Sequence, residues 1–312
     1  MAPMPAPTQL EFGYNPPTGD RGFETIRPAT FVADLHRALD VATQALPSVW
    51  ISDHLMFAEK YRLECWSQLL WIAARYPDVL LGTIVLANSF RPPALLAKMA
   101  ATLQTLSGGR FILGYGAGWH AEEYHAYGYD YPSTATRIAM LEEGIQVIRA
   151  LWTEAPASFE GRFYRLENAR CEPQPDPLPP LMIGGSGEQR TLRLVARYAD
   201  WWNDLLRPPT VLQHKLAVLR KHCDAEGREY DSLRKTVMVR VHIDRVHARA
   251  RAQAGDTLQS ETPPIAGDPA AVRDQLLALH ELGIDLVQLL FPRFPDTDDL
   301  HLFIDEVLPV FA

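Results

Sequence analysis

The sequence predicts an α/β protein folded as a single (β/α)8 barrel of the TIM type with insertions. Short β-rich runs alternate with longer amphipathic runs along the chain, and eight of the short runs qualify as strands. Strands such as LLGTIVL and TVMVRV are apolar at both alternating sets of positions, which is typical of a parallel sheet covered on both faces. A length of 312 residues suits one such barrel. A doubly wound open sheet is the alternative that the same pattern allows.

The predicted strands follow one another with a helix between most pairs. The helix after the third strand has clear sequence signals at both ends. Leu95, Met99 and Leu103 recur at helical spacing, Arg-Pro-Pro at 91–93 begins the helix, and Ser-Gly-Gly at 107–109 ends it. The eight predicted strands are Leu10–Gly13, Val49–Ser52, Val79–Leu86, Arg110–Tyr115, Leu181–Gly184, Asp200–Asn203, Thr236–His242 and Leu286–Phe291.

Two stretches do not fit a bare barrel. The first insertion, near residues 153–180, holds an aromatic alternation at Glu160–Pro173 that predicts a β-hairpin, followed by the proline-rich connector PQPDPLPP. The second, Asp244–Ala266, is polar and is predicted to be a long loop. Its arginines at 245, 249 and 251 are expected on a solvated face, with a clamp for an anionic substrate as the alternative. Residues 1–9 are predicted to be a disordered lead-in to one domain at 10–312.

Composition narrows the class of partner. The chain has 38 acidic and 30 basic residues and a formal charge of -8, which works against binding nucleic acid. Its three cysteines form no CxxC motif, so we expect neither a disulfide framework nor a zinc site. We see no signal-peptide pattern and no apolar run of membrane-spanning length. We therefore expect a cytoplasmic protein that acts on small molecules, without metal, nucleic acid or membrane as a partner.

Polar and glycine-rich segments follow several predicted strands, where a barrel carries its active site. Gly184-Gly185-Ser186-Gly187 leads into a helix whose first turn contains Arg190. Free amides, a hydroxyl and the positive end of a helix predict a phosphate site there, and a tight turn that needs glycine for its backbone angles is the alternative.

Two further strand ends carry candidate residues. In GYGAGWH, Gly114 to His120, glycine at every second position removes the side chains from one face. A flat ring could lie against that backbone, and a bulge or close packing explains the pattern equally well. His54 follows Asp53 at the end of the second strand, and the pair could supply a general acid or base. A hydrogen-bonded structural histidine is the alternative.

Together these segments resemble one family, the luciferase-like monooxygenases, which includes bacterial luciferase and the deazaflavin-dependent dehydrogenases and reductases. The resemblance runs from about Leu10 to Leu308, and it is specific because the segments occur together. The segments are SVWISDH (48–54), the long segment from LGTIVLANSF to EEYHAYG (81–128), the R-x-x-x-LEEGIQVIRALW helix (137–152), FEGRFYRLENARCEPQP (159–175) and IGGSGEQRTLRLVARYADWWN (183–203).

The resemblance implies a single barrel whose cofactor, FMN or the deazaflavin coenzyme F420, lies at the carboxyl ends of the strands. It implies that the phosphate is bound at Gly184–Thr191, that the ring lies against a bulge at Ile84-Val85, often with a non-proline cis peptide, and that His54 faces the substrate. The residues expected at the cofactor are Ile84, Val85, Asn88, Gly116, Ala117, Gly118, Gly184, Gly185, Ser186, Gly187 and Arg190; His54 and Asp53 are expected to be catalytic; Tyr14, Trp119 and His120 are expected at the substrate.

The resemblance also implies a choice of reactions. The preferred hypothesis is an F420-dependent oxidoreductase that transfers hydride to or from a small organic substrate while His54 moves the proton. The alternatives are a two-component monooxygenase that uses reduced FMN, O2 and a separate flavin reductase, and a non-catalytic flavin-binding protein. Sugar-phosphate dehydrogenases of the family carry glutamate where this chain has Trp119, so we do not expect glucose 6-phosphate as the substrate. Because dimers are common in the family, a homodimer is possible.

Overall fold

The eight central strands of the chain close into a parallel barrel. A computed structural model describes residues 9–311, so residues 1–8 of the predicted lead-in lie outside the described part. The strands pair in sequence order, and the ring closes because β10 pairs with both β9 and β12, and β12 pairs with β1. The barrel strands are β1 (Glu11–Tyr14), β2 (Ser48–Ile51), β3 (Leu80–Thr83), β5 (Phe111–Gly116), β8 (Leu181–Gly184), β9 (Trp201–Leu205), β10 (Arg234–Ile243) and β12 (Leu286–Leu290).

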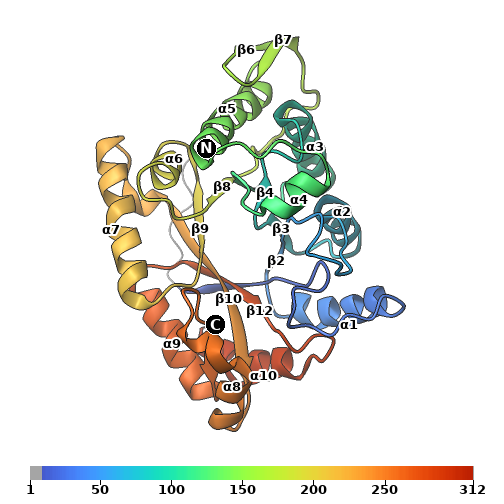
Figure 1. Cartoon of the computed structure of the whole chain (residues 1–312), viewed down its shortest axis with the longest axis vertical. Helices are drawn as coiled ribbons and strands as arrows, with labels where there is room; N and C mark the ends of the chain where they lie inside the picture. Colours follow the sequence, from blue (N-terminus) through green and yellow to red (C-terminus); the bar gives the residue numbers. More distant parts are fainter. Residues whose placement is uncertain (1–8, 312) are drawn as a thin grey trace.

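The helices lie outside this ring, as Figure 1 shows. The prediction of a (β/α)8 barrel is therefore confirmed, and the open sheet is excluded because the ring of strands closes. Among the described residues, no helix combines the length and apolar character needed to cross a membrane. The helices are α1 (Phe31–Thr43), α2 (Cys65–Arg75), α3 (Pro93–Leu106), α4 (Ala121–Ala126), α5 (Thr134–Thr153), α6 (Thr191–Tyr198), α7 (Pro209–Ala225), α8 (His247–Ala254), α9 (Pro269–Glu281) and α10 (Asp298–Glu306).

Two apolar cores follow from the alternation of side chains along each strand. The larger core fills the space between barrel and helices. The smaller lies inside the barrel and includes Trp50, Ile84 and Trp201. The Trp50 indole occupies space that glycine leaves open, because a Cβ at Gly82 would lie 2.2 Å from it. Packing inside the barrel therefore sets which positions near its centre must lack a side chain.

The third predicted strand is interrupted. In place of one strand from Val79 to Leu86, the chain forms β3 and then the short β4 (Leu86–Ala87), which pairs with β5. The peptide bond between Ile84 and Val85, in the interruption, is cis, as the family resemblance implied. The interruption puts Ile84 in the inner core and Val85 partly exposed beside it.

The first insertion agrees with its prediction and the second differs. β6 (Ala157–Glu160) and β7 (Arg165–Ala169) form an antiparallel hairpin that projects from the barrel (Figure 1). The region predicted as one long loop at 244–266 instead contains α8 and leads into β11 (Ile265–Gly267), which pairs with β10. Its alanine- and arginine-rich HARARAQA run has high helix propensity, and this signal outweighs the polar composition. The three arginines at 245, 249 and 251 are exposed as expected.

Candidate active site at the carboxyl end of the barrel

All eight barrel strands are parallel, so their carboxyl ends lie at one rim. His54 follows β2, Trp119 follows β5, and the segment 185–190 follows β8. These three parts of the chain therefore face the same end of the barrel, as the sequence hypothesis required. No group of three His, Cys, Asp or Glu side chains within residues 9–311 is arranged to hold a metal ion.

The segment after β8 presents free backbone amides. The Gly185 N–H donates to Asn203 O at 2.9 Å, whereas the amides from Ser186 to Arg190 have no acceptor within the described chain. Gly185 has a φ of +116°, a conformation that L side chains rarely adopt. The Arg190 side chain is exposed just before α6. Unpaired amides next to a cation and a helix N-terminus can bind a phosphate.

The missing side chains of the glycine-rich strand end leave space that the protein itself fills. A Cβ at Gly116 or Gly184 would lie 2.7 Å from a methyl group of Val85. A Cβ at Gly114 would lie 1.8 Å from the Thr83 carbonyl oxygen, and one at Gly118 would lie 1.8 Å from a tyrosine hydroxyl. The glycines therefore serve close packing, which favours the second of the two explanations for this pattern. Ala117, between them, is partly exposed.

His54 is held by a buried carboxylate from another element. Its Nδ1 lies 2.9 Å from Glu123 Oε1 in α4, and Glu123 is only 2% exposed. The other oxygen, Oε2, accepts from the amides of Leu55 at 2.7 Å and Met56 at 3.4 Å. Sequence reasoning missed Glu123, which is 69 residues from His54. A signal was present, since Glu123 is one of two acidic residues at the start of a short helix at the rim.

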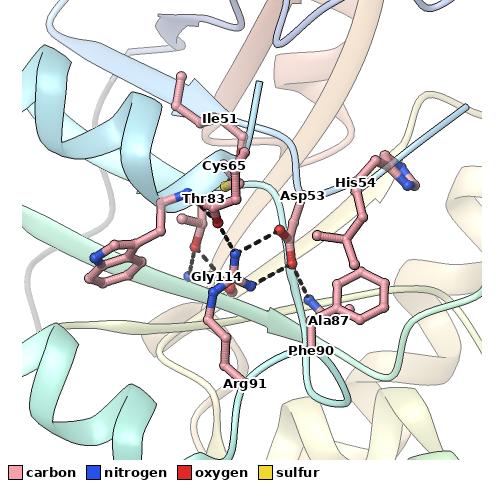
Figure 2. A network of polar contacts seen from close by, with 12 residues as sticks. Ile51, Asp53, His54, Cys65, Thr83, Ala87, Phe90, Arg91 and Gly114 are labelled. Carbon is pink, nitrogen blue, oxygen red and sulfur yellow. Dashed lines mark hydrogen bonds and ion pairs between the residues drawn. The ribbon is translucent and has the colours of Figure 1, made fainter. Parts of the chain in front are cut away.

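Asp53 was expected to pair with His54, and this expectation is wrong. Its carboxylate accepts from Arg91 Nη1 at 2.9 Å, from Arg91 Nη2 at 3.1 Å and from the Ala87 amide at 2.9 Å. Arg91 also binds Glu64. Figure 2 shows this network on one side of the strand end and the His54 ring turned away from it. The two neighbours therefore have separate partners after β2: Arg91 for Asp53 and Glu123 for His54.

Aromatic side chains surround the His54 ring. Phe57 and Trp119 meet it edge to face, with ring centroids 4.8 and 5.6 Å away. His120 stacks on Phe57 at 4.5 Å. Its buried Nε2 has no hydrogen-bond partner among residues 9–311, although Glu122 Oε2 lies 3.6 Å away. Trp119 is 63% exposed, an unusually large exposure for an indole. The arrangement offers a flat apolar surface beside an imidazole, which is compatible with the expectation that Trp119 and His120 face the substrate.

Two other expected site residues face elsewhere. Tyr14 belongs to the core between barrel and helices, and burial raises its pKa. It lies outside the barrel mouth, because its neighbour Gly13 faces inward onto Trp50. The side chain of Asn88 donates to the Tyr164 hydroxyl at 2.9 Å and accepts from the Tyr115 hydroxyl. The expectations for Tyr14 at the substrate and for the Asn88 side chain at the cofactor are therefore not supported.

The rim also contains a histidine on β10 that the expected site omitted. His242 is 8% exposed, and its Nδ1 has no hydrogen-bond partner. Burial, together with the nearby positive charge of the Arg240 guanidinium, lowers the pKa of His242 to about 4. Arg240 lies two residues away on the same side of the strand and donates to Thr262 O at 2.9 Å. His242 is therefore neutral at pH 7.

A closed (β/α)8 barrel with a turn of unpaired amides after one strand and an oriented histidine after another is typical of barrel enzymes whose sites lie at the strand ends. The chain matches the family described as luciferase-like monooxygenase over residues 17–265. It is 32% identical over 252 residues to an F420-dependent glucose-6-phosphate dehydrogenase of Kineococcus radiotolerans, a match that covers 77% of this chain and 74% of that protein. The chain belongs to the luciferase-like monooxygenase family.

Two other comparisons concern a monooxygenase relative and a solved dehydrogenase structure. The chain is 32% identical over 169 residues to the pyrimidine monooxygenase RutA of Escherichia coli, covering 52% of this chain and 45% of that protein. A solved F420-dependent secondary alcohol dehydrogenase, in complex with an F420-acetone adduct, aligns with a TM-score of 0.82 and 20% identity. That alignment covers 98% of this chain and 100% of the other, and at this identity it supports the fold alone.

Proposed function

We propose that this oxidoreductase uses coenzyme F420 to transfer hydride to or from a small organic substrate, and that His54 donates or accepts the accompanying proton. The observation that carries the proposal is the His54–Glu123 pair, which orients an imidazole at the same rim as the free amides after β8. The dehydrogenase relative that matches most of this chain is F420-dependent, which favours F420 over FMN.

The residues at the rim fit a phosphorylated tricyclic cofactor. The amides of residues 186–190 and the Arg190 side chain would bind its phosphate. Val85, which covers Gly116 and Gly184, would form the apolar surface behind its ring, with Ile84 buried beneath. A phosphate and a flat ring are common to F420 and FMN, so this fit supports both cofactors.

When bound, F420 supplies a hydride donor or acceptor. The chain's own residues then do three things. The rim segments hold the ring and its phosphate, the aromatic residues Phe57 and Trp119 limit access of water to His54, and His54 handles the proton. When a hydride leaves the substrate carbon, the proton on the adjoining oxygen or nitrogen passes to the His54 imidazole; in the reverse direction His54 returns it.

The substrate side favours an apolar or flat molecule. The exposed Trp119 indole lies beside His54, with ring centroids 5.6 Å apart. A stacking surface of this size contributes mainly through apolar burial, and it leaves no carboxylate at that position to act on a sugar. We therefore propose that the substrate differs from that of the glucose-6-phosphate dehydrogenase relative.

The second candidate is a monooxygenase that uses reduced FMN and O2. It is favoured by the identity to RutA, which covers half of this chain. This function would need a flavin reductase as a partner to supply the electrons. A non-catalytic flavin-binding protein is the third candidate, and the oriented His54–Glu123 pair argues against it.

Titration of the apoprotein with F420 and with FMN tests the proposal, using quenching of tryptophan fluorescence as the readout. We expect F420 to bind with a micromolar or lower Kd and FMN to bind at least tenfold more weakly. A panel of alcohols and ketones then identifies turnover through the change in F420 absorbance. His54→Ala should lower kcat about 10²- to 10⁴-fold, whereas His125→Ala, which changes an exposed histidine of α4, should not. Failure of both cofactors to bind would overturn the proposal.

A further inference from the structure

Glu123 is a buried carboxylate that the proposed reaction does not itself use. It lies in α4 and is 2% exposed. Its two oxygens have separate partners. Oε2 accepts from the backbone amides of Leu55 and Met56, and Oε1 faces His54 Nδ1 at 2.9 Å. The carboxylate is thus fixed to the backbone of the loop that carries the histidine.

This geometry determines which nitrogen of His54 carries the proton in the neutral ring. A carboxylate only accepts hydrogen bonds, so the nitrogen that faces Oε1 must be a donor. A neutral imidazole has one donor nitrogen and one acceptor nitrogen. With Nδ1 as the donor, Nε2 is the bare nitrogen, and it is the one free to accept a proton.

The packing around His54 keeps the ring in this orientation. Phe57 and Trp119 contact it edge to face, at interplanar angles of 74° and 83°, and the His54 side chain is 17% exposed. A ring flip would break the contact with Glu123 Oε1 and leave a buried carboxylate oxygen without its partner, which is costly. Glu123 therefore acts on the reaction through His54.

We propose that Glu123 is the positioning residue of His54: it holds the proton on Nδ1 and so makes Nε2 the atom that exchanges a proton with the substrate. This inference rests on the proposed function and deepens it, because it names the reacting nitrogen and the group that orients it. It also connects α4, which directly follows Trp119 and His120, to the reacting histidine.

The first test is the tautomer of His54 in the cofactor-free protein. Histidine-selective ¹⁵N labelling and NMR distinguish a protonated ring nitrogen from a bare one, and the His54 signals are assigned by their absence in His54→Gln. We expect a protonated Nδ1 and a bare Nε2 in the wild type. A neutral His54 protonated on Nε2 would overturn the inference, whatever the cofactor proves to be.

The second test compares variants of the carboxylate. Glu123→Gln keeps the shape but can face Nδ1 with either an oxygen or an amino group, so we expect mixed tautomers and a kcat lowered about 10- to 100-fold. Glu123→Asp keeps the charge, so we expect a protonated Nδ1 and a kcat between those of wild type and Glu123→Gln. Glu59→Gln, the same change at an exposed position of the loop that carries His54, should alter neither.

The affinity for F420 shows whether Glu123→Gln only loses the orientation of His54 or disrupts the whole site. We expect the Kd for F420 in Glu123→Gln to stay within about threefold of wild type, so that the loss appears in kcat. A Glu123→Gln protein with wild-type kcat and tautomer would overturn the inference. An absence of F420 turnover in the wild type would instead overturn the proposed function, and the tautomer of the cofactor-free protein would still decide the role of Glu123.

Discussion

Replacing Asp53 with asparagine tests whether this residue is structural or catalytic. Asp53 is 5% exposed and accepts three hydrogen bonds, two from Arg91 and one from the Ala87 amide. Burial works against the charge of Arg91, but the carboxylates around it, Asp53 foremost and Glu64 with it, together raise the pKa of Arg91 above its ordinary value. Asp53→Asn removes that charge while keeping the size of the side chain.

The expected cost follows from the number and burial of these contacts. Removing one partner of a buried ion pair costs about 3–5 kcal/mol. Here Arg91 keeps a second carboxylate, Glu64, whose side chain is 40% exposed, so its charge is not left unpaired. We therefore expect the low end, about 3 kcal/mol. With an m-value of about 3 kcal/mol/M, the urea midpoint falls by about 1 M.

Urea unfolding followed by tryptophan fluorescence measures this shift. Asp231→Asn, at an exposed position, is the matched control and should change the free energy of unfolding by less than about 0.5 kcal/mol. If Asp53 were the proton-transfer group, the result would be reversed: Asp53→Asn would unfold near the wild-type midpoint and lose turnover. That outcome would refute the structural role.

Three further predictions concern the rim. Gly184→Ala adds a Cβ 2.7 Å from a Val85 methyl group. We expect the free energy of unfolding to fall by about 1–3 kcal/mol and F420 to bind more weakly in a titration. Unchanged binding would contradict the assignment of Val85 to the ring surface. Arg190→Gln should raise the Kd for F420 several-fold, an effect that shrinks at high salt; a salt-independent Kd in the wild type would count against a phosphate contact. His242 has a pKa lowered from 6.5 to about 4, so the unfolded state binds its proton first and unfolding free energy should fall as pH drops from about 6.5 to about 4. His242→Gln should remove that part of the pH dependence, and identical pH profiles for both proteins would disprove it.

The barrel could be predicted because its signal is local and repeated. Each strand carries its own pattern, such as LLGTIVL, and a barrel strand between the outer helices and the filled interior is apolar on both sides. The HARARAQA run shows where this reasoning fails. Polar composition predicted a loop at 244–266, but alanine and arginine favour a helix even when nearly every side chain is exposed, and α8 forms there.

The candidate site could be predicted only in part. Strand ends located His54 and the segment after β8, because parallel strands bring their carboxyl ends together. The direction of each side chain could not be predicted in the same way. Asp53 and Tyr14 each follow a predicted strand, yet Asp53 lies in a buried ion pair and Tyr14 lies in the outer core.

The sequence by itself determined the class of fold, the rim on which the candidate site lies and the candidate histidine. These follow from the spacing of apolar residues and from the order of strands and helices, which can be read from neighbouring residues in the chain. Only the tertiary structure decided which carboxylate serves His54. Asp53 is adjacent in sequence but points away, and Glu123 is distant but reaches Nδ1. Contacts between residues far apart in the sequence depend on how whole elements pack, and a local sequence pattern does not show which distant residues meet.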